Sequence, residues 1–184
     1  MKSLFSHKLV MKLAIVLLIF PVLTALPNDF HTGLSGGIGL PKVPYSGYRL
    51  PVSVLVGAFA QQPLAGKWML RGEAFGLTTI HLGTWNGSDL PLRFNLLWAS
   101  ADGCFRMSGF ITSATWLEAG IGWYRLDQKF GNNSAKLGTP GLNIGVLTQQ
   151  SGFLNRMTFD IRWHLLFNPS PNPQVFTITL GFLL

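Results

Sequence analysis

The sequence predicts an all-β protein, a closed antiparallel up-and-down transmembrane β-barrel with eight strands as the expected number. Three observations lead to this prediction. Large apolar and polar side chains alternate along most of the chain, so each strand has one apolar and one polar face. Only 11% of the residues are charged, against about 25% in a typical soluble domain. After the N-terminal region, no stretch has the ~20 unbroken apolar residues that a membrane helix needs.

The N-terminal region is expected to be a secretion signal peptide covering residues 1–25, with the barrel domain in residues 26–184. Three lysines precede a short apolar core at Leu13–Leu23, and small residues up to Ala25 offer a cleavage site. The apolar run is about half the length of a membrane-spanning helix, which favours secretion over a membrane anchor.

Four strand-like segments come first, each with apolar residues at alternate positions between turn signals: Asp29–Leu40, Leu50–Ala60, Trp68–Leu77 and Leu90–Ser100. In the first segment, glycine and polar residues form the second face, which suits the restricted space inside a narrow barrel. In the third, Arg71 and Glu73 lie opposite Trp68. In the fourth, Trp98 is expected on the apolar face and Arg93 on the polar one.

Five further segments follow the same pattern: Phe105–Ile111, Thr115–Leu126, Gly141–Thr148, residues 153–167 and Gln174–Leu184. The first of these is the weakest, whereas residues 153–167 show the clearest alternation, with Trp163 opposite Arg162. Nine segments in total conflict with the even strand numbers of bacterial membrane barrels. Either 105–111 and 115–126 contain one strand too many, or a strand near residues 78–82 is missing. We therefore expect eight strands, with ten as the alternative.

The expected connections are of two lengths. Residues 101–103 are predicted to form a tight hairpin and residues 149–152 another short connection. Longer polar connections are expected at 79–89, 127–139 and 168–173. Short connections at one end and long ones at the other are typical of membrane barrels.

The two faces give two sets of candidate functional residues. The aromatic residues expected to face lipid are Trp68, Phe94, Trp98, Trp123, Phe159, Trp163, Phe176 and Phe182. The residues expected to form a polar network in the lumen are Arg71, Glu73, Arg93, Asn95, Glu118, Asp160, Arg162 and His164. Because an unpaired buried charge is costly and a narrow barrel holds little besides side chains, we expect these charges to pair and fill the lumen.

With these features the chain resembles the small outer-membrane β-barrel proteins of Gram-negative bacteria, those with an OmpA-like transmembrane barrel. The resemblance rests on the leader, on residues 120–127 and 141–145, and on the C-terminal strand. In that family the last strand usually ends in Phe or Trp, whereas here Leu184 is the final residue and Phe182 precedes it by two. The resemblance implies a cell envelope protein in the bacterial outer membrane, inserted by the barrel-assembly machinery and in contact with outer-membrane lipids and lipopolysaccharide.

The same resemblance implies a non-enzymatic role, either structural or in surface interactions through the connections at 79–89 and 127–139. A weaker resemblance to the lipid A deacylase barrels rests on residues 72–76 and on His164. Those enzymes have a serine nucleophile two residues after the histidine, and here that position is Leu166. The chain is therefore predicted not to be an enzyme.

Three alternatives stay open: a lipid A or phospholipid hydrolase of the outer membrane, a small porin-like pore, and a secreted lipid-binding barrel with its apolar face inward. A nucleic-acid partner is not expected, because the basic residues are scattered without a stripe or cluster. No metal site is predicted, since the histidines lack ligand spacing and Cys104 is the single cysteine. No cofactor is predicted either.

Overall fold

The computed structural model describes the following residues: 30–42, 48–49, 53–79, 84–85, 88–89, 92–107, 114–130, 133–150, 155–167 and 173–184. The predicted signal peptide, residues 1–25, and the expected domain boundary after it lie outside the described residues. None of the residues that the structure describes belongs to a helix long and apolar enough to cross a membrane.

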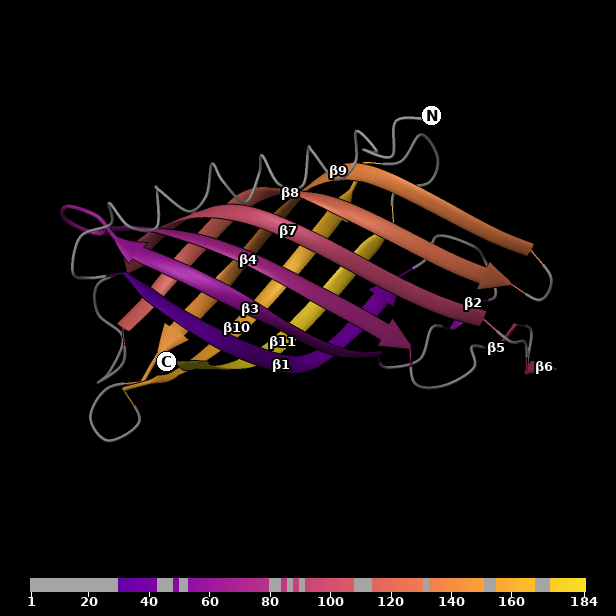
Figure 1. Cartoon of the computed structure of the whole chain (residues 1–184), viewed down its shortest axis with the longest axis horizontal. Coiled ribbons are helices and arrows are strands. Elements are labelled where there is room, and N and C mark those ends of the chain that lie inside the picture. Colours follow the sequence, from indigo (N-terminus) through magenta and orange to yellow (C-terminus); the bar gives the residue numbers. More distant parts are fainter. Residues whose placement is uncertain are drawn as a thin grey trace, which may run out of the picture. The chain divides into compact units, whose positions relative to one another are not determined.

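Within this described part, eight long antiparallel strands close into a barrel (Figure 1). They are β1 (His31–Lys42), β3 (Ser53–Pro63), β4 (Trp68–Thr79), β7 (Leu92–Met107), β8 (Ala114–Phe130), β9 (Asn133–Gln149), β10 (Met157–Leu166) and β11 (Gln174–Leu183). Around the barrel the order is β1-β11-β10-β9-β8-β7-β4-β3, and β1 closes the ring by pairing with both β3 and β11. The predicted eight-stranded up-and-down barrel is confirmed.

The hairpin expected at residues 101–103 is wrong, because β7 runs through it without interruption. Asp102 lies opposite Arg71 on one neighbouring strand and Gly120 on the other. Its carboxylate points into the barrel and accepts hydrogen bonds there, so an Asp-Gly pair that could form a turn is held in an extended strand by its interior partners. Strand β7, Leu92–Met107, therefore joins the segments expected at 90–100 and 105–111, which reduces nine segments to eight.

The long polar connection expected at residues 127–139 is also wrong. Strands β8 and β9 stay paired as far as Phe130 and Asn133, which leaves only residues 131–132 between them. Polar composition indicated a loop, but strands that project beyond an apolar band can be polar on both faces.

The barrel has two unlike ends. The start of β1 and the end of β11 lie at one end, here called the terminal end, where the connections are residues 64–67, 108–113 and 150–156. The opposite end, here called the loop end, carries the connections 43–52, 80–91, 131–132 and 167–173. Two of these pair with each other in a small second sheet formed by β2 (Tyr48–Arg49), β5 (Thr84–Trp85) and β6 (Ser88–Asp89).

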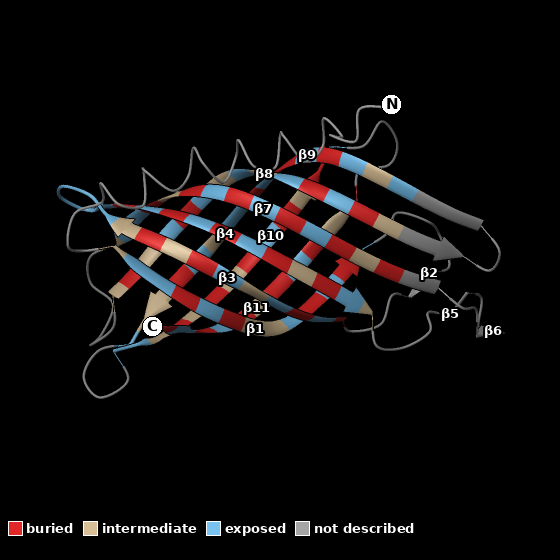
Figure 2. Cartoon of the chain, viewed as in Figure 1, coloured by how far each residue is buried: buried red, intermediate tan, exposed pale blue. Residues whose placement is uncertain are grey.

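Buried and exposed residues alternate along the barrel strands (Figure 2). The buried set fills the inside in three layers. An apolar layer lies toward the loop end and includes Leu55, Phe75, Leu77, Phe94, Leu96, Trp98, Tyr124, Leu126, Leu166 and Val175. A smaller apolar layer lies toward the terminal end and contains Met69, Cys104 and Leu147, with Trp116 packed against it. Between the two apolar layers lies a layer of charged side chains.

Candidate functional site

Arg162 on β10 is the centre of the charged layer. Its guanidinium group forms ion pairs with four carboxylates: Nη2 lies 2.7 Å from Glu118 and 2.8 Å from Asp160, Nη1 lies 3.1 Å from Asp102, and Glu73 is the fourth partner. These carboxylates come from strands β4, β7, β8 and β10, so one side chain ties half of the barrel wall together. All five side chains are almost completely buried. We call this set, together with Arg71, the ion-pair plug.

Arg71 on β4 is the second cation of the plug. It lies 3.7 Å from Glu73 and 3.6 Å from Asp160, and its Nη1 donates a 3.5 Å hydrogen bond to Gln61. Its guanidinium carbon lies 4.2 Å from the centre of the Phe59 ring, a cation–π contact. Four carboxyl groups thus share two guanidinium groups, and the loss of either cation would leave several buried carboxyls without a partner.

A second group of buried side chains joins the plug to the apolar layer at the loop end. The Tyr124 hydroxyl lies 3.0 Å from Nδ1 of His164, and Nε2 of His164 lies 3.2 Å from the Thr177 hydroxyl. The indole N–H of Trp98 donates a 3.2 Å hydrogen bond to Glu73, and its ring meets the His164 ring edge to face at 5.1 Å. Both nitrogens of His164 are thereby engaged inside the barrel.

Two inward-facing glycines make room for side chains that reach across a strand. Gly120 lies between Asp102 and Asn143 in the register, and the Asn143 amide donates a 2.8 Å hydrogen bond to Asp102 over it. A Cβ built on Gly120 would collide with the Asp102 carboxylate. Gly141 similarly lies under the Tyr124 ring, whose hydroxyl reaches His164 on the next strand. Because these two glycines have no side chain, polar groups on the strands to either side of them can contact each other directly.

The lumen residues expected from the sequence are found in three situations. Six are buried inside and joined by the contacts above: Arg71, Glu73, Glu118, Asp160, Arg162 and His164. The prediction for Asn95 is wrong, since it lies on the outer face and accepts a 2.7 Å hydrogen bond from the Thr78 hydroxyl. The side chain of Arg93 lies outside what the structure describes, although its backbone is paired in β7.

Of the eight aromatic residues expected to face lipid, six lie on the outer face and two face inward. Outer-face positions are occupied by Trp68, Trp123, Phe159, Trp163, Phe176 and Phe182. Phe94 and Trp98 were expected there, and this is wrong: they face inward and are 1% and 5% exposed. Alternation assigns residues to two faces but does not tell which face is inside. On β7 the outer face carries small residues at Ala99, Ala101 and Gly103 beside Leu97 and Phe105, and the inner face carries the aromatics that fill the loop-end layer.

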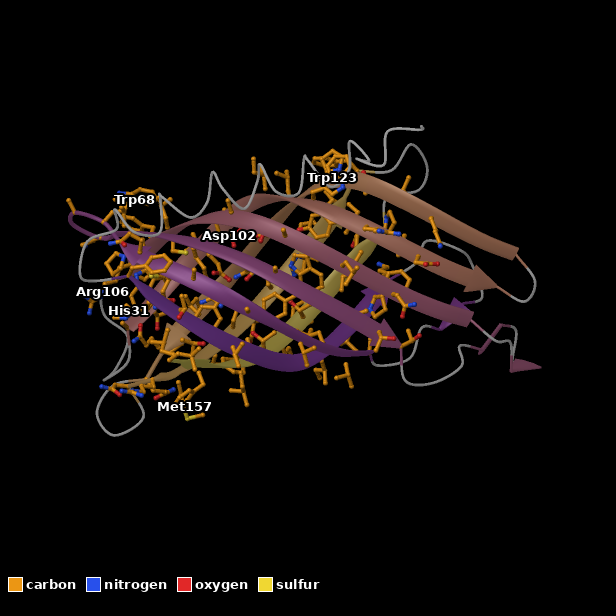
Figure 3. The ribbon with its side chains drawn as sticks, in the orientation of Figure 1. His31, Trp68, Asp102, Arg106, Trp123 and Met157 are labelled. Atoms are coloured by element: carbon orange, nitrogen blue, oxygen red, sulfur yellow. The ribbon has the colours of Figure 1, made fainter. Side chains whose placement is uncertain are left out.

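Sequence reasoning missed Asp102, Asn143, Tyr124 and Thr177 as members of the interior network. A signal for Asp102 was available, because extending the alternation of β7 through residues 101–103 puts Asp102 on the same face as Trp98. A carboxylate is costly in lipid, so this charge indicates that the face with Trp98 is the inner one. Figure 3 shows Asp102 among the strands, and Trp68 and Trp123 at separate places along the barrel. Among the described residues, no group of three or more His, Cys, Asp or Glu is placed to hold a metal ion.

Comparison with known proteins gave no matching family model and no matching curated protein. Solved structures do match. Neisserial surface protein A is 8% identical with a TM-score of 0.59, and the match covers 84% of this chain and 97% of that one. A major outer membrane protein from Thermus thermophilus is 10% identical with a TM-score of 0.56, covering 84% and 99%. Ail, the attachment invasion locus protein of Yersinia pestis, is 12% identical with a TM-score of 0.53, covering 85% and 99%. At these identities the likeness is one of fold, and the chain has the fold of the small bacterial outer-membrane barrels.

Proposed function

We propose that this chain is a non-enzymatic barrel of the bacterial outer membrane, with a structural or surface-interaction role and a lumen closed by the ion-pair plug. The barrel-assembly machinery would insert it, and outer-membrane lipids, lipopolysaccharide among them, would surround it. The observation that carries the proposal is the placement of charge: the plug is buried inside, and large apolar side chains cover the outside.

The outer face supports contact with lipid. Ile121 is 67% exposed and Trp123 is 59% exposed, and they belong to a set of exposed large hydrophobic side chains on all eight barrel strands. Soluble monomers rarely expose contiguous apolar patches of more than a few hundred square ångströms. The shortest barrel strands have 10 residues, which meets the ~9–11 that a tilted strand needs to cross a bilayer. A secreted lipid-binding barrel would need the opposite arrangement, with charge outside.

The filled lumen supports a role other than conduction. Side chains of all eight strands contribute to the buried interior, and Arg71, Phe94, Tyr124 and Arg162 are among the largest of them. An eight-stranded barrel is just wide enough for side chains to fill it. In a planar bilayer we expect no stable single-channel conductance, and a steady open level would contradict this part of the proposal.

The surroundings of His164 support a non-enzymatic role. The side chain is 1% exposed, both ring nitrogens have partners, and Leu166, at the nucleophile position of the deacylase barrels, is itself fully buried. A general base must reach a proton of its substrate, and no substrate atom has access to this ring. Lipid A from cells expressing the chain should therefore have an unchanged mass spectrum.

The loop end supports a surface role. The connections 43–52 and 80–91 meet in the sheet of β2, β5 and β6, so this end carries paired backbone in addition to the barrel strands. The expected interaction loop at 127–139 is replaced by the projecting hairpin of β8 and β9. We propose that these two features form the surface available to partners.

The proposal is tested by measuring where the full chain is found in the cell and whether it is folded there. We expect it to fractionate with outer membranes and to migrate faster on gels when unheated than when boiled. Recovery as a soluble protein without detergent would contradict the proposal.

A further inference from the structure

A groove of about 550 Å³ crosses the outer face of the barrel toward the loop end. Its lining comes from four neighbouring strands and consists of Val54, Val56, Gly76, Leu77, Thr78, Asn95, Leu97, Arg125 and Asp127. Most of these residues form two rows in the register. One row runs Val56, Gly76, Leu97, Arg125 and the next runs Val54, Thr78, Asn95, Asp127. The groove therefore spans the line where the apolar outer face gives way to polar side chains.

Arg125 gives this groove a positive charge. The side chain is exposed, and within the described part of the chain it has no hydrogen bond or ion pair. The carboxylate of Asp127, also in the lining, lies 3.8 Å from Lys136 and is neutralised there. These three residues together leave one net positive charge at the groove.

Asn95 adds a second hydrogen-bond donor beside that charge. Its carbonyl oxygen accepts the bond from the Thr78 hydroxyl at 2.7 Å, so the amide N–H groups are turned away from that bond. No hydrogen bond from this amide nitrogen occurs among the described residues. The polar side of the groove thus offers a guanidinium and an amide as donors, the groups that bind phosphate oxygens.

The apolar side of the groove is hollow because a glycine lies in its floor. Gly76 leaves a gap between Val56 and Leu97 in the row. Exposed Trp123 lies on the same outer face of β8, two residues before Arg125, and tryptophan is enriched where acyl chains meet headgroups. The donors are therefore placed at headgroup level, and the apolar floor extends toward the acyl chains.

We propose that this groove binds one phosphorylated glycolipid of the outer leaflet, the lipid A part of lipopolysaccharide. Arg125 and Asn95 contact a sugar phosphate, and an acyl chain lies over Gly76 between Val56 and Leu97. This inference rests on the proposed membrane location. Two other grooves on the outer face have no charged residue in their linings and serve as internal comparisons, one beside Gly36 and one beside Ile121.

The first test removes the charge. Arg125→Gln is compared with Arg156→Gln, which removes an exposed arginine in the connection between β9 and β10 at the terminal end. Full-length protein folded in detergent micelles is titrated with diphosphorylated lipid A, and bound lipid is counted by native mass spectrometry. We expect one bound lipid A for the wild type. Loss of a charge-assisted contact should weaken binding by Arg125→Gln about tenfold, with Arg156→Gln within about twofold of the wild type.

The second test fills the groove and keeps the charge. A Cβ on Gly76 would meet only the tip of the Leu97 side chain, at 3.1 Å, so Gly76→Leu should fold. Gly72, another outward glycine of β4, lies outside the groove, and Gly72→Leu is the control. We expect Gly76→Leu to weaken lipid A binding to a similar extent and Gly72→Leu to leave it unchanged.

Binding of other ligands, measured in the same way, tests whether the groove is selective for a phosphorylated glycolipid. Equal binding of dephosphorylated lipid A would overturn the proposal, as would equal binding of phosphatidylglycerol or full competition by inorganic phosphate. Unchanged affinity in Arg125→Gln would overturn it as well. Heat-modifiable migration is recorded for each variant, because a folded barrel without lipid A preference contradicts only this inference, whereas failure of the wild type to fold in detergent contradicts the membrane proposal.

Discussion

The Arg162 guanidinium on β10 lies 2.7 Å from the Glu118 carboxylate on β8, although β9 runs between them. The register shows how this contact is possible. Gly145 of β9 is opposite Glu118 on one side and opposite Arg162 on the other. A Cβ on Gly145 would lie 3.0 Å from the Glu118 carboxylate and 2.5 Å from the Ile161 carbonyl oxygen. The ion pair passes over a position that only glycine leaves empty.

Gly145→Ala should therefore destabilise the barrel. The methyl group meets backbone on one side and the central ion pair on the other, and inserting a methyl group into a packed interior costs about 1–3 kcal/mol. The measurement is the free energy of unfolding in urea, in lipid vesicles. The matched control is Gly72→Ala on the outer face, where the nearest atom to the new Cβ is 3.9 Å away and no loss is expected. Equal stability of the two variants would show that the Gly145 site can relax.

Replacing the central cation should cost more than replacing an exposed one. Arg162→Gln leaves four buried carboxyls sharing Arg71, and breaking a buried pair from one side typically costs about 3–5 kcal/mol. Lys136→Gln breaks the exposed pair with Asp127, worth about 0–1 kcal/mol. Unfolding midpoints in urea give the comparison. If the two substitutions lowered stability equally, the plug would not be a main source of barrel stability.

The interior charges of β10 were predictable from the sequence because alternation is strict where charged and apolar residues oppose each other. The strand number also needed the rule that such barrels have even strand numbers, because alternation alone gave nine segments. On β10, Asp160 and Arg162 oppose Trp163, and no other assignment of faces keeps the charges out of lipid. On β7 the same rule fails. Arg93 and Asn95 near its start are polar, yet Asn95 faces outward, since this part of β7 lies where the outer face turns polar.

The long-range contacts of the plug could not be predicted. They depend on which residues the register places side by side, such as Asp102 with Asn143 across Gly120, and register is set by the closure of the whole barrel. Composition misled at residues 127–139 for a related reason. A polar segment that extends past the membrane can continue as paired strand, because its hydrogen bonds to the neighbouring strand do not depend on side-chain polarity.

The inward position of Trp98 can be tested by quenching with brominated lipid. Bromine atoms on acyl chains quench tryptophans that touch lipid, so Trp123→Phe should remove emission that brominated vesicles quench. Trp98→Phe should remove emission that these vesicles leave unquenched, because Trp98 packs between Phe75 and Tyr124 inside the barrel. Both variants are first checked for folding by their unheated gel migration. Strong quenching of the Trp98 emission would mean that Trp98 faces lipid and that the inner and outer faces of β7 are assigned the wrong way round.

The reactivity of Cys104 tests the orientation of β7 independently, near the terminal end of the strand. Its side chain is fully buried, in the terminal-end apolar layer with Met69 and Leu147, and its sulfur lies 3.9 Å from the Glu118 carboxylate. A maleimide reagent needs access to the thiolate, so the folded protein should stay unlabelled and the protein unfolded in urea should react fully. In a Cys104→Ser background, Arg106→Cys puts a thiol at the exposed terminal end of β7, where the same maleimide should label the folded barrel. Rapid labelling of native Cys104 would mean that the terminal-end layer is open, which the packing of this layer does not allow.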